Sequence, residues 1–167
     1  FVATSSEYRL SRIETWLSRK CDYGVDLLGD CFQLNQSRIA ISSGGLFGLG
    51  PGTSRARWGS LPNSYSDFIS SIIGEEYGFF GLFLLVLAFF ILITTTFLIA
   101  IREKNEIKKL ISVGFGSWIF FQTVINLGGA VGIVPITGIV LPFVSYGSSA
   151  MISIFIALGI MYSRDYE

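Results

Sequence analysis

An uncharged stretch decides the fold: residues Gly78 to Ile101 read GFFGLFLLVLAFFILITTTFLIAI. A helix needs about 20 consecutive apolar residues to cross the hydrocarbon core of a membrane. This stretch is therefore long enough for one membrane span. A second uncharged stretch, from Leu110 to Ser163, is long enough for two. The sequence therefore predicts an all-α membrane protein with three spanning helices.

Helix-breaking residues divide the second stretch. They are Asn126, Gly128, Gly129, Pro135, Gly138 and Pro142. Non-helical backbone near a membrane must be buried in protein or line a wet cavity. We therefore expect the three spans over 68–101, 110–128 and 143–162, with the glycine pair ending the second span and a loop over 129–142.

The eight residues 102–109, between the two stretches, include four Lys or Arg residues. Short basic loops stay in the cytoplasm, whereas long loops obey this rule weakly. The rule predicts a cytoplasmic loop over 102–109, a cytoplasmic tail over 163–167, and an extracytoplasmic location for 129–142. It also places 1–67 outside as a large loop. Separately, we expect residues 1–3 to be the end of a preceding span.

Composition excludes several classes of function. Charged residues make up 14% of the chain, against about 25% in soluble domains. Twelve basic and twelve acidic residues cancel, so the net charge gives no reason to expect a nucleic-acid partner. The chain has no histidine, which excludes Ser-His-Asp and Cys-His catalysis and His-ligated zinc. Cys21 and Cys31 would lie on the oxidising side and could pair, although an unpaired or incidental state is the favoured expectation.

The outer segment shows local order of its own. Ser5 to Lys20 has the pattern of an amphipathic helix lying on a membrane surface, and Gln33 to Ile41 fits a short helix. Residues 44–52 contain five glycines, which allow positive φ and close backbone approach. The loop lacks the Gly-Lys-Ser/Thr of a Walker motif, and a folded connector is its favoured interpretation.

Acidic residues mark the entrance to the first span. Asp67 stands where the outer loop enters the helix, so it or a neighbouring serine, Ser64 or Ser66, would make a good N-cap. Glu75 and Glu76 follow about 12 Å further along at 1.5 Å per residue. They either face a cavity or a partner, or lie solvated at the level of the lipid headgroups.

Hydroxyl groups mark the entrance to the third span. They belong to Ser145, Tyr146, Ser148 and Ser149. Such groups either cap the helix and bond to neighbouring helices or line a polar pocket. Both interpretations stay open from the residues alone.

Short motifs in a fixed order cover nearly the whole chain. They are Tyr8-Arg9 with Arg12-Ile13, Phe32-Gln33 with Gln36-Ser37, Ser43-Gly44-Gly45, Gly48-Leu49-Gly50, Leu61-Pro62 ahead of Asp67-Phe68-Ile69, Glu75-Glu76 with Gly78, Asn126 with Gly128, Pro135-Ile136-Thr137-Gly138, and Leu141-Pro142-Phe143 with Ser145-Tyr146-Gly147. Each motif is weak alone, but together they resemble the C-terminal half of the SEDS family (shape, elongation, division and sporulation), the FtsW, RodA and SpoVE proteins. Ser54-Arg55 resembles the division branch or its sporulation relative more than the elongation branch.

The resemblance implies a membrane glycosyltransferase with a fold of roughly ten helices, of which this chain would supply the large outer loop and the last three spans. Such a protein sits in the bacterial cytoplasmic membrane and polymerises lipid II into glycan strands during cell division or cell-shape maintenance. Its partners would be a class B penicillin-binding protein, other membrane proteins of the division or elongation machinery, and membrane lipids.

The resemblance also assigns roles to residues. Asp67 matches the family's essential acid and would act as general base. Arg55 and Arg57 match basic positions that could pair with the leaving diphosphate, for which a divalent cation is the other candidate. The remaining substrate-binding candidates are Gln36, Ser37, Glu75, Glu76, Ser145 and Tyr146.

The chain departs from the family pattern at two places. Asn63 and Tyr65 stand where the family usually has Glu and His, and Ala150 ends a motif that has lost its second glycine. A second class of function also stays open, because broken helices and a central acid fit a lipid-linked precursor flippase or a scaffold for a partner synthase. An acid in the outer loop rather than at mid-membrane favours the enzyme.

Overall fold

The computed structural model describes residues 13–18, 21, 31–58 and 65–162. Its elements in chain order are α2 (Phe32–Ser43), the 3-10 helix η1 (Ala56–Trp58), α3 (Ile69–Arg102), α4 (Glu106–Val131) and α5 (Ser148–Tyr162). Within the described ranges there is no β-strand. The predicted all-α fold is confirmed for this part of the chain, and so is the short helix expected around residues 33–41, which is α2.

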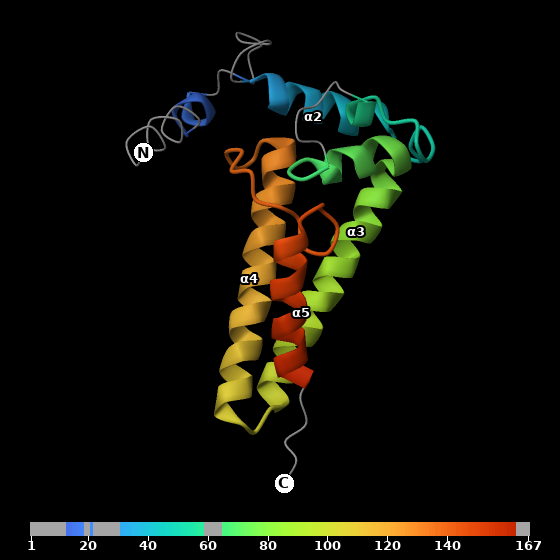
Figure 1. The fold of residues 1–167 in the computed structure, drawn as a ribbon. Coiled ribbons are helices and arrows are strands. Elements are labelled where there is room, and N and C mark those ends of the chain that lie inside the picture. Colours follow the sequence, from blue (N-terminus) through green and yellow to red (C-terminus); the bar gives the residue numbers. More distant parts are fainter. Residues whose placement is uncertain (1–12, 19–20, 22–30, 59–64, 163–167) are drawn as a thin grey trace.

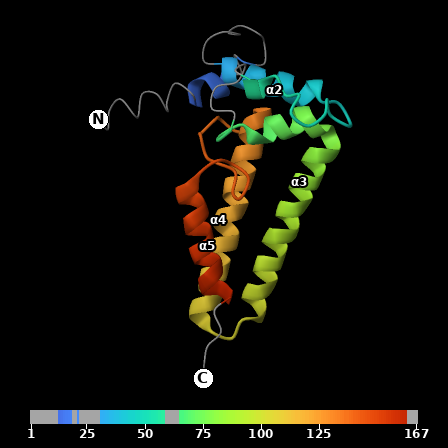
Figure 2. The ribbon, with the colours of Figure 1, turned by 45° about the vertical axis from the view of Figure 1, so that its right-hand side comes forward.

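The helices form a bundle with a crossing helix at one end. α3 and α4 pack along each other, and α5 packs against α4. α2 lies across the end of the bundle opposite the turn that joins α3 to α4 (Figures 1 and 2). The segments before α3 and before α5 meet at the same end as α2 (Figure 1). Loop residues that are far apart in the sequence are therefore brought together there.

Two helices are long and apolar enough to cross a membrane, α3 with 34 residues and α4 with 26. The core helix of a soluble protein would be mostly covered, yet only 11% of the most apolar window of α3 and 33% of that of α4 are buried. The exposed apolar faces of α3 and α4 are therefore suited to contact with lipid. α5 has 15 residues, about 22 Å of helix against a hydrocarbon core of about 30 Å, so the third span stays a prediction.

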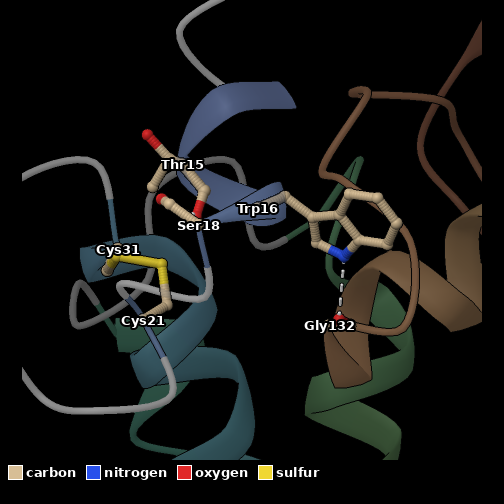
Figure 3. The surroundings of a disulfide bond; sticks show 6 residues. All are labelled: Thr15, Trp16, Ser18, Cys21, Cys31 and Gly132. Atoms are coloured by element: carbon tan, nitrogen blue, oxygen red, sulfur yellow. Dashed lines mark hydrogen bonds between the residues drawn. A yellow bond between two sulfur atoms is a disulfide. The ribbon is translucent and has the colours of Figure 1, made fainter.

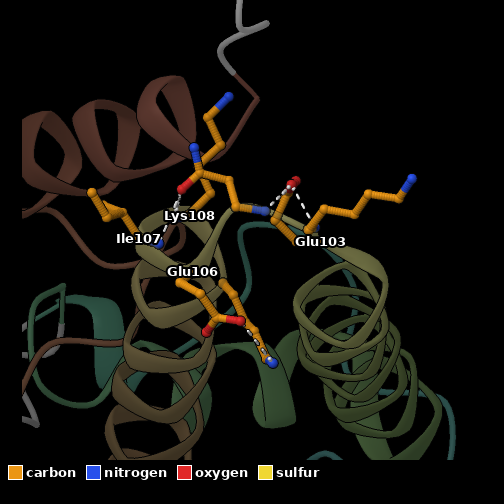
Figure 4. Close-up of polar contacts among 7 residues, drawn as sticks. Glu103, Glu106, Ile107 and Lys108 are labelled. Atoms are coloured by element: carbon orange, nitrogen blue, oxygen red, sulfur yellow. Dashed lines mark hydrogen bonds and ion pairs between the residues drawn. The ribbon is translucent and has the colours of Figure 1, made fainter.

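α4 is longer at both ends than the sequence suggests. Asn105 is its N-cap, with Oδ1 accepting from the backbone N–H groups of Ile107 and Lys108 at 3.0 and 3.4 Å (Figure 4). This cap starts the helix at Glu106 rather than at 110. The helix also runs through its glycine pair and ends only at Gly132, where φ is 85°. The expectation that the pair ends the helix is wrong, because a left-handed glycine cap lies beyond it.

α5 begins at Ser148, five residues later than the expected start at 143. The chain ahead of it forms turns over 142–146, and Phe143 has a positive φ of 61°. Ser145 and Tyr146 therefore lie in the loop before the helix.

Two buried clusters hold the bundle together. One lies between α2, α3, α4 and η1, and consists of Ala40, Ala56, Phe68, Ile72 and Ala130. The other lies along the bundle, and consists of Phe89, Phe115, Ile119, Leu141, Ile154 and Met161. The first cluster is next to the loops that carry the candidate site, so packing there fixes their position.

A disulfide joins Cys21 to Cys31, directly ahead of α2 (Figure 3). The expectation of unpaired cysteines is therefore wrong. Their two Cα atoms lie 5.2 Å apart, which is within the range for a disulfide. Close by, the indole Nε1 of Trp16 donates to the carbonyl of Gly132 at 3.2 Å. Residues 13–17 of the predicted amphipathic helix are helical and Ser18 lies in a turn. Its residues 5–12, 19 and 20 lie outside the described residues.

Candidate functional site

Asp67 lies in a turn directly before α3 and is half-buried. The helix begins with Phe68 at its N-cap position, and no side chain caps it. The position of Asp67 in the sequence favours an N-cap role for it. This role is wrong, because α3 begins at Ile69 and Phe68 takes the N-cap position. The carboxylate instead lines a small pocket with residues of α4 and of the loop over 136–139.

Three consecutive carbonyls hold this turn in place. The carbonyl oxygens of residues 65–67 accept, in order, from the backbone N–H of Tyr146 at 3.1 Å, the hydroxyl of Ser145 at 2.5 Å and the side-chain amide of Asn126 at 3.0 Å. Asn126 also donates to the carbonyl of Ile139 at 2.8 Å. We call these contacts the carbonyl clamp. It ties the turn that carries Asp67 to α4 and to the loop before α5.

Gly138 faces the carboxylate across the pocket. Its φ is +71°, and a Cβ built on it would lie 3.4 Å from Oδ2 of Asp67. A side chain there would be strained and would narrow the space beside the carboxylate. The Pro135-Ile136-Thr137-Gly138 motif thus keeps one side of Asp67 open.

The glycine-rich loop fills a break in α3. At Gly78 the helix has φ 66° and ψ −158°, which frees backbone groups on either side. Four hydrogen bonds from the loop satisfy them: Leu49 N to Glu75 O, Gly50 N to Glu76 O, Phe79 N to Gly45 O and Phe80 N to Leu46 O, all between 2.9 and 3.2 Å. The loop is therefore a folded connector, as expected, and it also completes the helix that it touches.

The approach is close because both sides lack side chains. A Cβ on Gly48 would lie 2.1 Å from the carbonyl oxygen of Glu76, and one on Gly44 would lie 1.9 Å from that of Gly74. Gly78 would collide with the loop backbone in the same way, at 2.4 Å from Gly48 N. Only glycine fits at these positions, because any Cβ would collide with backbone atoms, and backbone cannot move aside as a side chain can.

Glu75 is 2% exposed and binds the chain after the glycine loop. Its carboxylate accepts from the hydroxyl of Ser54 at 2.6 Å and from the backbone N–H groups of Arg55 and Ala56 at 3.1 and 3.2 Å. Of the two interpretations left open, the one in which this glutamate faces a partner is correct. The bound segment is the one that carries Arg55, whose side chain is exposed; the side chain of Arg57 lies outside the described residues.

Glu76 is also buried, at 7% exposure, and its Oε1 has no hydrogen-bond partner among the described residues. A solvated position is therefore wrong for this residue as well. A buried carboxylate oxygen without a hydrogen-bond partner is unusual in a membrane protein and points to a functional or assembly role.

The other candidates differ in accessibility. The hydroxyl of Ser37 is fully buried and donates to the carbonyl of Ala130 at 2.6 Å. It also lies 2.7 Å from the hydroxyl of Ser71, so it joins three helices. Ser145 uses its hydroxyl inside the carbonyl clamp and also accepts from Leu141 N at 2.8 Å. Gln36 is half-buried on α2, whereas Tyr146 is 85% exposed.

The described residues contain no group of three or more His, Cys, Asp or Glu side chains that could hold a metal ion. Near Asp67 they offer one carboxylate and the unpartnered amide oxygen of Asn126. Mg²⁺ in proteins is commonly held by one or two carboxylates together with substrate phosphates. This donor set alone does not form a dedicated metal cage.

The sequence suggested no site role for Asn126 or Ser54, although both stand in motifs that resemble the family. The signal for Asn126 was its position in an uncharged stretch of 54 residues, where a side-chain amide needs internal partners. The partner of Ser54 depends on a contact across 21 residues, which no local pattern indicates.

The fold and the site define an all-helical membrane protein that holds a carboxylate in a pocket at one end of its helices. The chain belongs to the FtsW/RodA/SpoVE family of cell cycle proteins, whose sequence profile matches residues 1–167.

Relatives are similar over almost the whole chain. A probable peptidoglycan glycosyltransferase FtsW from Wigglesworthia glossinidia brevipalpis is 39% identical over 96% of this chain and 42% of its own length. Stage V sporulation protein E from Bacillus subtilis (strain 168) is 40% identical over 98% of this chain and 45% of its own length. The chain thus spans less than half the length of these relatives.

A solved structure is also similar. It comes from work on the structural coordination of polymerization and crosslinking by a peptidoglycan synthase complex, and it matches with a TM-score of 0.67 at 28% identity. The match covers 92% of this chain and 40% of that one. The arrangement of helices described above is therefore similar to that of a protein solved in this setting.

Proposed function

We propose that this protein is a peptidoglycan glycosyltransferase that polymerises lipid II, of the division type or its sporulation relative. The observation that carries the proposal is the carboxylate of Asp67, which lines a pocket at the end of the bundle while the carbonyl clamp holds the backbone of its turn. Family membership and the names of the relatives support the same activity.

In this mechanism Asp67 is the general base. It takes the proton from the 4-hydroxyl of an acceptor GlcNAc, whose oxygen then attacks the anomeric carbon of a donor MurNAc. The glycosidic bond forms as the bond to polyprenyl diphosphate breaks, and the diphosphate leaves with its electron pair. A base must lie within hydrogen-bond reach of that proton, and Gly138 leaves room for a hydroxyl on one side of the carboxylate.

Arg55 and Arg57 are proposed to stabilise the diphosphate as it leaves. The segment that carries them is bound by the buried carboxylate of Glu75, so its backbone is fixed while the side chain of Arg55 stays exposed. Arginine pairs with phosphate oxygens through two parallel hydrogen bonds.

We propose a positioning role for Ser37, Ser145 and Glu75, since their polar atoms already have internal partners. For Gln36 and Tyr146 we propose contact with substrate. Glu76 keeps an unpartnered oxygen and remains a candidate for contact with substrate or a partner helix.

The proposed membrane orientation follows the basic loop. The α3–α4 turn follows Arg102 and includes Lys104, and it lies at the end of the bundle opposite α2 and the start of α3 (Figure 1). Asp67 directly precedes the start of α3. With that turn in the cytoplasm, Asp67 and α2 lie on the outer side of the bacterial cytoplasmic membrane. A class B penicillin-binding protein and other membrane proteins of the division machinery are the proposed partners there.

The activity can be tested with purified full-length protein and lipid II. Glycan strands are expected from the wild type, and Asp67→Asn is expected to lower their initial rate by roughly 10²–10⁴-fold, the usual contribution of a general base. Glu106→Gln, which changes an exposed carboxylate at the other end of the bundle, serves as the control and should leave the rate unchanged. Unchanged polymerisation by Asp67→Asn would refute the assignment of Asp67 as the base. Transport of lipid II across vesicles by the wild type without any polymerisation would favour the flippase alternative.

A further inference from the structure

The side-chain amide of Asn126 has a fixed orientation. Its Nδ2 group donates to the carbonyl oxygens of Asp67 and Ile139, at 3.0 and 2.8 Å. Only the NH₂ end of an amide can bond to two carbonyls, because the other end carries no hydrogen. A flipped amide would place its oxygen against both acceptors. The oxygen Oδ1 therefore points away from these two partners.

This oxygen is buried and has no hydrogen-bond partner among the described residues. Asn126 as a whole is 5% exposed. Buried polar atoms in folded proteins are nearly always hydrogen-bonded, and each exception calls for an explanation such as a missing water or ligand. This oxygen can therefore gain a hydrogen bond only from a donor outside the described residues.

Asn126 also lines the pocket of Asp67. Both side chains, together with Thr137 and Gly138, surround a cavity of about 10 Å³, which is about the space that one water-sized group needs. A group that enters this space must be no larger than a water or a hydroxyl. A hydrogen-bond donor suits it, because of the two lining residues Asp67 carries a carboxylate and Asn126 an amide oxygen without a partner. The hydroxyl groups of a sugar have this chemistry.

We infer that Asn126 is a substrate-binding residue, whose Oδ1 accepts a hydrogen bond from the ring hydroxyl next to the one that faces Asp67. This rests on the proposed function, since it takes a sugar acceptor as the ligand. Because the space holds only one such group, the hydroxyl that donates to the amide oxygen enters it, and the reacting hydroxyl donates to the carboxylate from the mouth of the pocket. The hydroxyl bound to the amide sets the orientation of the ring.

The arrangement explains why asparagine suits this position. Its two ends do different work: Nδ2 holds the backbone of Asp67, and Oδ1 binds the sugar. A sugar lacking the second hydroxyl would leave the buried acceptor unpaired, and sites built around such groups reject analogues that lack the donor. Asn126 is therefore a residue that determines specificity for the acceptor.

The test is a cycle between enzyme variant and substrate analogue, using the full-length protein. The donor is lipid II with its 4-hydroxyl blocked, and the acceptor carries a reducing end that cannot leave, so a single coupling is measured. The acceptor is used in its natural form and as the 3-deoxy analogue, in which the hydroxyl next to the reacting one is replaced by hydrogen. The quantity compared is kcat/KM for the acceptor.

For the wild type we expect the deoxy acceptor to lose about tenfold in kcat/KM, the value of one hydrogen bond to a buried acceptor. Asn126→Ala breaks part of the carbonyl clamp and should slow coupling with both acceptors, but it should remove the difference between them. Ser145→Ala is the matched control, because it weakens the clamp without changing the lining of the pocket, and it should keep the tenfold difference.

Three results would overturn the inference: a wild type that does not distinguish the acceptors, an Asn126→Ala variant that still does, or a Ser145→Ala variant that loses the distinction. The first or second result would mean that only water occupies the position, or that the acceptor binds elsewhere. All of these differ from failure of the proposed function, in which the wild type forms no coupled product with either acceptor.

Discussion

At the scale of single residues, the candidate base depends on donors that are distant in the sequence. Ser145 lies 79 residues from the carbonyl of Ser66 that it binds, and Asn126 lies 59 residues from Asp67. These contacts give Asn126 and the Ser145-Tyr146-Gly147 motif a structural role beside Asp67. They hold its backbone without occupying its carboxylate.

Ser145→Ala is therefore expected to lower turnover. The substitution removes a hydrogen bond to Ser66 and leaves the N–H of Leu141 without its acceptor, a destabilisation of about 1–3 kcal/mol. We expect kcat for lipid II polymerisation to fall with KM nearly unchanged. Ser71→Ala removes a buried hydroxyl bond of similar kind between helices and is the control. Equal losses of kcat in both variants would argue against a role for the clamp in catalysis.

Glu75→Gln is expected to loosen the segment that carries Arg55. A glutamine has one acceptor oxygen and turns an NH₂ group toward the N–H donors that a carboxylate accepts, and we expect a loss of about 1–3 kcal/mol. The measurement is the rate of trypsin cleavage after Arg55, which should rise several-fold together with a lower melting temperature. Glu106→Gln changes only an exposed pair with Lys109 at 3.9 Å and should alter neither quantity. Equal cleavage in the wild type and Glu75→Gln would contradict the assignment.

At the scale of elements, the break in α3 is the feature that sequence patterns could not indicate. The uncharged stretch predicts a helix correctly, yet Gly78 inside it has a left-handed φ because the glycine loop supplies the missing hydrogen bonds. The turn before α3, the late start of α5 and the disulfide likewise depend on contacts across the chain. Composition and periodicity predict the presence and type of α2, α3 and α4. They do not predict where these helices begin and end, because contacts with distant residues change the ends.

Gly48→Ala is expected to disrupt the junction between the glycine loop and α3. The added Cβ would meet the carbonyl of Glu76 at 2.1 Å, and a collision with backbone falls in the rare class of losses above about 4 kcal/mol. Gly52→Ala is the matched control, since Gly52 has a similar φ of +79° but open space around it. It should show only the backbone strain of about 1–2 kcal/mol. Thermal unfolding of the two variants in detergent measures the difference, and equal melting temperatures would refute the close packing.

The disulfide ahead of α2 gives a prediction at the same scale. Closing ten residues of chain is expected to contribute about 2–3 kcal/mol on the chain-entropy account. Intact mass under non-reducing conditions should be two hydrogens lower than after reduction, and reduction should lower the melting temperature. A protein whose mass does not change on reduction would show that Cys21 and Cys31 do not pair.

At the scale of the whole molecule, the arrangement of helices separates two ends with different chemistry. One end holds Asp67, the carbonyl clamp and the buried glutamates, and the other holds the basic turn that leads into α4, whose N-cap is Asn105. The sequence predicted this division through its charge pattern. It could not predict the pocket, which needs α4, the loop over 136–139 and the turn before α3 to meet.

The orientation in the membrane can be checked by chemical labelling of introduced cysteines. Thr53→Cys is expected to react with a membrane-impermeant maleimide in intact cells, because Thr53 is exposed at the end that holds Asp67. Lys104→Cys, at the basic turn, should react only after the cells are made permeable. The reverse pattern would place the candidate site on the cytoplasmic side and remove the basis for polymerisation outside the cell.

The central claim is that the carboxylate of Asp67 accepts the proton of the attacking hydroxyl. The most direct measurement is a structure of the full-length protein with a non-reactive acceptor analogue bound, in which the distance from the 4-hydroxyl oxygen to the nearer carboxylate oxygen is determined. The account predicts about 2.6–3.2 Å, the reach of a general base. An ordered acceptor whose 4-hydroxyl lies beside another residue, with Asp67 out of reach even through one water, would contradict it.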